Sequence, residues 1–485
     1  MNTREFLPQA LPGIAPVGSL VEAAPLPAAG EPLDTGTEPV TPGLSLQSTF
    51  AWILTGNVVY AACQWGAIVA LAKLGSSFMI GQFSLGLAIA SPVLMSTNLH
   101  LRAVQATDAR RLYSFGAYLR LRTAMTLGGL AVITGIACFG NYERQTAMVI
   151  LAVAFAKGIE TLSDIHYGLF QLNDRLDQIG RSMMLRGALS VLALSTGLYA
   201  TRNLLWGCVG LALVWLSALL LFDVRRGRRF VVGAESLAPL LGRTIRRRTS
   251  RQAQGFRRQL SLMRTALPLG IAMTMATLNL NMPRYFIHAR LGENQLGIFS
   301  AMAYATVAMI LVSDSLGHCA IPRMSRLYTG GRLAEFGSLL LRLLAAGGVL
   351  GLAGLAVAQV LGVRLLTLFY GREYAAHSRI FMVMILATAI HCVACMFTSA
   401  ITSARCFRIQ VPLYALVAGS NALACARWVP TAGLAGGAAA MVVAAVVHLV
   451  LGAAVVGGLL WAPAKRVACP QTTESCMNDW EGRSL

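Results

Sequence analysis

Polar side chains run through an apolar stretch at 265–288, ALPLGIAMTMATLNLNMPRYFIHA. They are spaced alternately three and four residues apart, so a helix places them on one face: Thr274, Thr277, Asn281, Arg284 and His288. A charged side chain inside a bilayer costs on the order of 2.5–3.5 kcal/mol, so it usually faces a bundle interior or an aqueous cavity. We therefore expect this seam to line a path for a hydrated ligand. Hydrogen bonding between neighbouring helices is the alternative.

A second seam precedes it in the apolar stretch near 50–73. Asn57, Tyr60 and Gln64 have the same spacing as Thr274, Thr277 and Asn281, at an offset of 217 residues. Because the two seams match in spacing, we expect them to lie on equivalent helices and to line the same path.

Three charged residues lie together in the apolar stretch near 146–169. Lys157, Glu160 and Asp164 share a helical face, which places one cation and two carboxylates inside the membrane. Two carboxylates one turn apart cannot both ionise cheaply in a low dielectric, so they are candidates for proton or sodium coupling. A self-satisfied ion-pair cluster that fixes helix packing is the alternative.

The composition indicates a polytopic all-α membrane protein. Of 485 residues, 56% are hydrophobic and 12% charged, and the mean hydropathy is +0.63. The net charge of +20 comes almost entirely from arginines clustered in a few loops, a pattern typical of membrane topology rather than of nucleic-acid binding. No phosphate loop, HExxH motif or nucleophile elbow is present. We therefore expect neither an enzyme nor a bound cofactor or metal.

Windows of about 20 residues give about twelve membrane spans in two six-helix halves. The halves look like repeats, because GQFS at 81–84 returns as GIFS at 297–300, an offset of 216 residues, and FGAYL at 115–119 returns as FGSLL at 336–340. Two like-oriented halves imply a pseudo-two-fold axis along the membrane normal, with a substrate path between the halves.

Five parts follow along the chain. We expect a disordered cytoplasmic tail at 1–44, a first half at 45–222, a basic cytoplasmic linker at 223–264, a second half at 265–462 and a cytoplasmic tail at 463–485. The linker is basic enough to lie on anionic lipid headgroups. The loops richer in arginine belong on the cytoplasmic side, which places both termini there.

Several stretches resemble one family. The segment 159–187, IETLSDIHYGLFQLNDRLDQIGRSMMLRG, resembles the helix 4 to helix 5 region of the Wzx-type polysaccharide flippases. These belong to the multidrug/oligosaccharidyl-lipid/polysaccharide exporter superfamily. PRYFIHARLGENQLGIFS at 283–300 and LLTLFYGREY at 365–374 resemble further family elements, and the likeness spans roughly 50–460.

The resemblance implies an exopolysaccharide export protein of the bacterial inner membrane. Its substrate would be an undecaprenyl-diphosphate-linked oligosaccharide that moves from the cytoplasmic to the periplasmic leaflet, driven by an ion gradient or the membrane potential. Polysaccharide polymerase and chain-length or export proteins would be its partners. Arginine suits a diphosphate because its planar fork binds two oxygens at once, so Arg284 and Arg186 are the candidate contacts. The two seams, with His288, would line the sugar path.

Three alternatives remain open at this point. A drug or organic-cation antiporter of the same superfamily would favour acidic residues in its cavity. An integral-membrane polysaccharide polymerase usually has a large periplasmic loop, whereas the longest outward loop expected here, near 362–379, is short. A peptidoglycan-precursor flippase would have an extra pair of helices.

Overall fold

The computed structural model describes residues 46–98, 101–102, 105, 114–236 and 250–461. The tails expected at 1–44 and 463–485 lie outside this described part of the chain. Every element within it is helical. A bilayer offers the backbone no hydrogen-bond partners, so helices that satisfy their own N–H and C=O groups are the stable form for such apolar sequences.

The first half of the chain forms a group of helices that we call the N-lobe. Its elements are α1 (Leu46–Leu74), α2 (Ser77–Asn98), α4 (Phe115–Phe139), α5 (Arg144–Leu172), α6 (Leu176–Thr201), α7 (Leu204–Ser217), the π-helical segment η1 (Ala218–Val224) and α8 (Arg225–Ser236). The segment expected to be a linker therefore begins as a helix, because α8 continues directly from α7 through η1.

The second half forms the C-lobe. Its elements are α9 (Ser250–Ala305), α10 (Val307–Thr329), α11 (Leu333–Phe369), the short α12 (Arg372–Ala375), α13 (Ser378–Ser403), α14 (Phe407–Ala432) and α15 (Leu434–Trp461).

The long helix α9 folds back on itself at Gly292. This residue has φ 79° and ψ −178°, a conformation that glycine adopts without strain. Residues from both sides of the fold lie together, since the guanidinium of Arg284 lies 5.6 Å from the Tyr304 ring centroid and the side chains of Ile287 and Phe299 both approach Gly437. Two antiparallel spans therefore meet at Gly292, and the second continues through a 42° bend into α10.

The number of spans agrees with the sequence-based expectation of about twelve. Ten helices in the described part of the chain are long and apolar enough to cross a membrane, and the bent pair of α9 and α10 brings the number to eleven. Counting α9 separately on each side of Gly292 supplies the twelfth. The expected all-α polytopic fold is confirmed.

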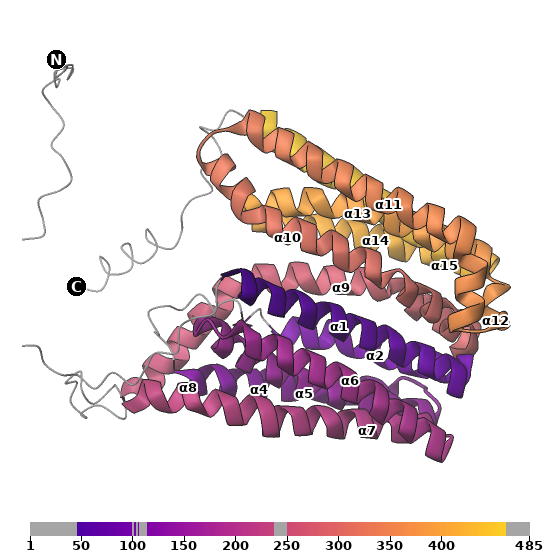
Figure 1. Ribbon diagram of the computed structural model, residues 1–485, viewed down its shortest axis with the longest axis horizontal. Helices are drawn as coiled ribbons and strands as arrows, with labels where there is room; N and C mark the ends of the chain where they lie inside the picture. The colour runs from indigo at the N-terminus through magenta and orange to yellow at the C-terminus, as the bar shows by residue number, and fades with distance from the viewer. Residues whose placement is uncertain (1–45, 99–100, 103–104, 106–113, 237–249, 462–485) are drawn as a thin grey trace, which may run out of the picture. The chain divides into compact units, whose positions relative to one another are not determined.

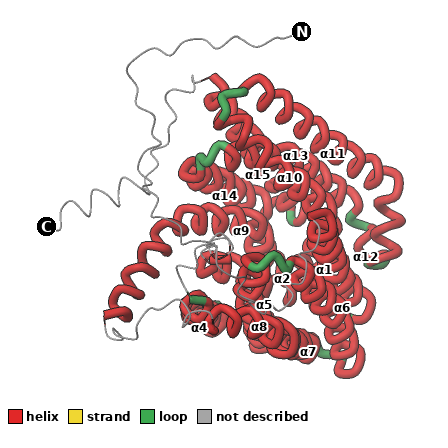
Figure 2. Tube along the Cα trace, turned by 60° about the vertical axis from the view of Figure 1, so that its left-hand side comes forward, coloured by secondary structure: helices red, strands yellow, loops and turns green. Residues whose placement is uncertain are grey.

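The two lobes lie on either side of α9. Figure 1 shows α1, α2 and α4–α8 on one side of α9 and α10, α11 and α13–α15 on the other, and the rotated view in Figure 2 shows the same division. The main apolar core runs from one lobe to the other, since it includes Phe83 and Trp215 of the N-lobe and Phe299 and Phe381 of the C-lobe. The principal contact between lobes is made by α2 and α9.

Candidate functional site

A cavity of about 450 Å³ lies between the lobes. It is placed toward the end of the molecule where α1 begins and α2 ends, because Ile53, Met95 and Ile179 contribute to its wall. Its charged and hydrogen-bonding lining comes from α1, α5, α9 and the segment after α2: Asn57, Arg102, Lys157, Glu160, Asp164 and Thr277. Asn57 and Thr277 belong to the two seams expected from the sequence, so the structure brings both seams to one cavity.

The first polar network in the cavity joins α1 to α5. The Tyr60 hydroxyl donates to Glu160 Oε1 at 2.6 Å, and Gln64 Nε2 donates to the Tyr60 oxygen at 2.8 Å. On the other side of the carboxylate, Lys157 Nζ lies 2.6 Å from Glu160 Oε2. The seam on α1 and the charged face on α5, which the sequence presents as separate features, thus form one network.

The second network is centred on Asp164. Arg122 Nη2 lies 2.8 Å from its Oδ2, and Arg102 Nη1 lies 3.1 Å from its Oδ1. Arg122 is fully buried and also donates to the carbonyl oxygens of Thr161 at 2.9 Å and Asn98 at 2.7 Å. Arg122 is therefore held by three partners, whereas the side chain of Arg102 is 35% exposed and faces the cavity.

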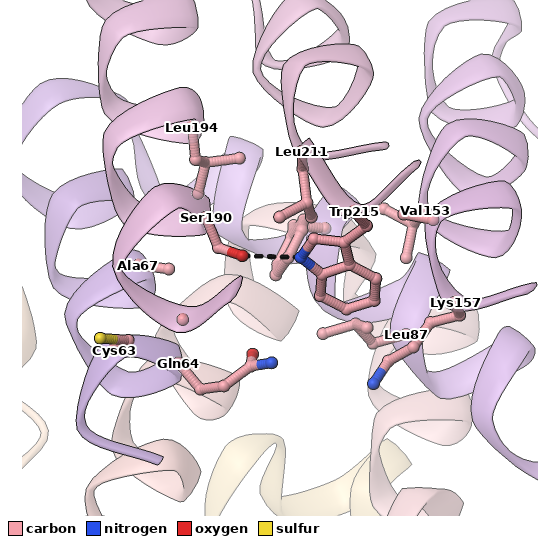
Figure 3. Close-up of a pocket in the computed structure, with 13 residues that line it drawn as sticks. Cys63, Gln64, Ala67, Leu87, Val153, Lys157, Ser190, Leu194, Leu211 and Trp215 are labelled. Carbon is pink, nitrogen blue, oxygen red and sulfur yellow. Dashed lines mark hydrogen bonds between the residues drawn. The ribbon is translucent and has the colours of Figure 1, made fainter. Parts of the chain in front are cut away.

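A smaller cavity adjoins the first and shares Lys157 with it. Its volume is about 20 Å³, enough for a single water molecule. Figure 3 shows Gln64 and Lys157 at this cavity together with Trp215, whose Nε1 donates to Ser190 Oγ at 2.6 Å. Polar groups thus continue from the larger cavity past Glu160 into the core of the N-lobe.

Arg186 lies in this N-lobe core and is absent from the lining of the larger cavity. It is 2% exposed and pairs with Asp223 Oδ2 at 3.0 Å, and it donates to Ser163 Oγ at 2.5 Å. Asp223, in η1, is fully buried and also accepts from Ser182. The structure thus places the guanidinium in a closed ion pair rather than at the position expected for a diphosphate contact.

The polar seam of α9 bonds mainly within its own helix. Thr274, Thr277 and Asn281 donate to carbonyl oxygens four residues earlier, at distances of 2.8 to 2.9 Å. Arg284 Nη1 donates to Asn281 Oδ1 at 2.6 Å and forms no ion pair among the described residues. His288 Nε2 lies 3.5 Å from Glu293 Oε1, across the fold at Gly292. Only Thr277 of this seam reaches the lining of the larger cavity.

The opposite end of the molecule is closed by a crossing of α2 and α9. A Cβ atom at Gly81 would lie 2.6 Å from the carbonyl carbon of Glu293, and one at Gly297 would lie 2.6 Å from the carbonyl carbon of Ser77. Both pairs obey the repeat, since 81 and 297 differ by 216 and so do 77 and 293. We call this contact the glycine crossing. It pairs the GQFS and GIFS motifs in the reciprocal manner that a pseudo-two-fold axis requires.

Hydrogen bonds between lobes surround the glycine crossing. Ser77 Oγ bonds to Asn294 Oδ1 and, at 3.0 Å, to Glu373 Oε1. Thr146 Oγ1 bonds to Glu293 Oε1 at 3.2 Å. These polar bonds connect the lobes at the end where the α1–α2 turn lies.

A further bond at this end joins α1 to the C-lobe. Trp65 Nε1 donates to the Tyr370 hydroxyl at 2.7 Å. Burial raises the pKa of the Tyr370 phenol above its usual value, so this residue stays neutral as an acceptor. In this structure the cavity therefore lies near one end of the lobes while the other end is sealed.

Sequence reasoning missed several participants in these networks. Arg102 and Arg122 are among the arginines that the topology argument assigns to a cytoplasmic loop, yet both pair with Asp164. Asp223 falls at the first position of the expected linker, yet it is fully buried. A carboxylate inside a membrane needs a cation, and that requirement was the available signal for an arginine partner of Asp164.

Comparison with known proteins adds to this description. No family model matches the chain. The capsular polysaccharide biosynthesis protein CapF of Staphylococcus aureus is 24% identical over 336 residues, which is 69% of this chain and 80% of that protein. The lipid II flippase MurJ, in an inward closed conformation, has a TM-score of 0.62 at 9% identity and covers 84% of this chain and 87% of that one. A mutant of the Vibrio cholerae MATE transporter VcmN has a TM-score of 0.55 at 12% identity, over 85% and 95%.

At these identities the solved structures establish the fold, and they are structures of transporters and a flippase. The expected architecture of two six-helix halves is confirmed, and the protein is a multi-pass membrane protein. The resemblance to a flippase of the multidrug/oligosaccharidyl-lipid/polysaccharide exporter superfamily is confirmed, and the chain has the two-lobed helical fold of that superfamily.

Proposed function

We propose that this protein moves an undecaprenyl-diphosphate-linked oligosaccharide from the cytoplasmic to the periplasmic leaflet of a bacterial inner membrane by alternating access. The observation that carries the proposal is the charged cavity between the lobes, sealed at one end by the glycine crossing. Two names among the similar proteins support the substrate class, since one relative is a capsular polysaccharide biosynthesis protein and one structure is a lipid II flippase.

The arginine distribution orients the proposal. The arginine-rich loops place both termini in the cytoplasm, so α1 begins and α2 ends on that side. The cavity then faces the cytoplasm, and the glycine crossing closes the periplasmic end. Exposed Arg225, Arg228 and Arg229 of α8 would contact anionic lipid headgroups on the cytoplasmic surface.

The cavity suits an anionic headgroup that carries sugars. Arg102 and Lys157 are the cations that line it, and both carboxylates there already have cationic partners, which favours an anionic over a cationic substrate. Asn57, Tyr60, Gln64 and the amides and hydroxyls of α9 would bond the sugars. The acyl tail can remain in the surrounding lipid.

Arg284 is proposed as a later contact on the path. It follows the cavity-lining Thr277 by seven residues on α9, which places it about 10 Å closer to the sealed end. Thr274 and Asn281 flank the same route, and His288 lies beyond Arg284. Rocking the lobes apart at the glycine crossing would carry the diphosphate from Arg102 and Lys157 toward Arg284.

The membrane potential can drive this movement. Two negative charges that move outward against an outside-positive potential of about 100 mV gain roughly 4–5 kcal/mol. Coupling to an ion through Glu160 or Asp164 adds to this driving force. Polysaccharide polymerase and chain-length or export proteins would receive the product on the periplasmic side.

The test is the leaflet location of the lipid-linked repeat unit in cells that lack this protein. Spheroplasts are treated with a membrane-impermeant sugar label, and the same cells carrying the wild-type gene provide the comparison. The proposal expects an unlabelled, inner-leaflet intermediate that becomes labelled on rescue. Labelled but unpolymerised lipid in the deficient cells would show that the defect follows flipping, and would favour a polymerase or a later export step.

A further inference from the structure

The charges around the cavity do not balance equally on both carboxylates. The cavity wall and the arginine behind it hold three cations, Arg102, Arg122 and Lys157, against two carboxylates, Glu160 and Asp164. The site therefore carries a net charge of +1. The nearby Arg186 does not change this sum, because Asp223 neutralises it.

The two carboxylates differ in how firmly their cations are held. Asp164 keeps Arg122 whatever happens in the cavity, because that guanidinium is buried and bonded to two backbone carbonyls. Glu160 has Lys157 as its only ion-pair partner among the described residues, and otherwise accepts one bond from Tyr60. A ligand that takes Lys157 would therefore leave Glu160 charged and uncompensated in a low dielectric.

A glycosylated lipid diphosphate carries two negative charges and needs both cavity-facing cations. Resting on the proposed function, we propose that the diphosphate replaces Asp164 as the partner of Arg102 and Glu160 as the partner of Lys157, and that Glu160 takes up one proton from cavity water as it binds. Without that proton the filled site has a net charge of −1. With it the site is neutral.

The geometry indicates which oxygen receives the proton. Glu160 Oε2 faces Lys157 and is freed when the lysine turns to the ligand, whereas Oε1 keeps its bond from the Tyr60 hydroxyl. The other titratable or charged groups around Glu160 are Tyr60 on α1, Asp164 and Tyr167 on α5 and Arg186 on α6. Of the carboxylates near the cavity, Asp164 retains Arg122 and Asp223 retains Arg186, so Glu160 is the group that gains the proton.

The experiment counts protons in the purified full-length protein in lipid nanodiscs. The probe is farnesyl-diphosphoryl-N-acetylglucosamine, whose two phosphates are both esterified and do not titrate near neutrality. Binding is measured by calorimetry in two buffers of different ionisation enthalpy. The wild type should take up about one proton per probe bound, and its Kd should rise by up to about tenfold per pH unit on the alkaline side. Glu160→Gln, which mimics the protonated side chain, should bind with no proton uptake and little pH dependence.

The matched control is Glu335→Gln, the same change at an exposed carboxylate on α11 that pairs with Arg332. It should take up protons as the wild type does. Wild-type binding without proton uptake would overturn the inference whether or not the variant folds, and uptake that persists in Glu160→Gln would overturn the assignment to this residue. Failure of the wild type to bind the probe at any pH would instead count against the proposed function.

Discussion

Substituting alanine at the glycine crossing should open the sealed end. A Cβ atom at Gly81 would lie 2.6 Å from the carbonyl carbon of Glu293, whereas ordinary van der Waals contact begins at 3.4 Å. The two helices must therefore separate by at least 0.8 Å (3.4 − 2.6). Their backbones meet directly there, so no flexible side chain can move aside to absorb the change. The same arithmetic holds for Gly297 and Ser77.

The cost of such overpacking is about 1–3 kcal/mol. It applies only to the state in which the crossing is closed, so the ratio of open to closed molecules should rise by about 5-fold to 150-fold. The double variant should cost less than the sum of the two, because one widening of the crossing relieves both contacts.

Spin-label distances measure this shift. Labels at Glu143→Cys in the N-lobe and Arg372→Cys in the C-lobe report the sealed end, in a protein whose exposed Cys138 and Cys319 are replaced by serine. Gly81→Ala should move the distribution toward longer distances and reduce polysaccharide export.

Gly128→Ala is the matched control for this measurement. Gly128 lies on α4 with no atom within 4 Å of the added Cβ, so its substitution should leave the distances unchanged. An unchanged distribution in both Gly81→Ala and Gly297→Ala would refute the crossing as the seal.

Three further predictions concern single bonds. Tyr60→Phe removes the hydroxyl bonded to Glu160, and the loss of about 1–3 kcal/mol should appear as a lower melting temperature and weaker export at normal membrane abundance. Asp223→Asn leaves Arg186 as an unpaired buried charge, so the protein should lose about 3–5 kcal/mol of stability, read out as reduced yield and early melting. Trp65→Phe deletes a bond from α1 to the C-lobe, and the spin-label distances should shift toward the open form by about fivefold in population if the bond contributes about 1 kcal/mol.

The sequence anticipated the architecture because membrane solvation leaves few choices. Apolar stretches of sufficient length must be helices, and the repeat of GQFS as GIFS located the equivalent helices. The same repeat could not show that these two motifs touch, since an offset along a chain carries no distance. Direct contact followed only from the position of Gly81 against Glu293 in space.

The cavity was anticipated in part. Asn57, Lys157 and Glu160 were found by helical spacing, which identifies residues on one face of one helix. Spacing cannot identify a partner on another helix, so Tyr60 and Glu160 were assigned to different roles although they share a hydrogen bond. Arg102 and Arg122 were interpreted as loop charges because they lie outside the apolar windows. Burial, rather than sequence position, separates a topological arginine from a structural one.

The repeat preserves the closing contact but not the charges. Both halves supply a glycine and a facing backbone carbonyl to the crossing, yet the membrane carboxylates and the lysine of the cavity all come from α5 of the N-lobe. In the C-lobe, α13 holds a corresponding place as the fourth span of its half and contains no carboxylate or lysine within Ser378–Ser403. Movement of the lobes therefore depends on both halves, while recognition of a charged ligand depends on one. This separation means that changes at Gly81 or Gly297 should alter the balance of conformations with little effect on intrinsic affinity. Changes at Glu160 should do the reverse.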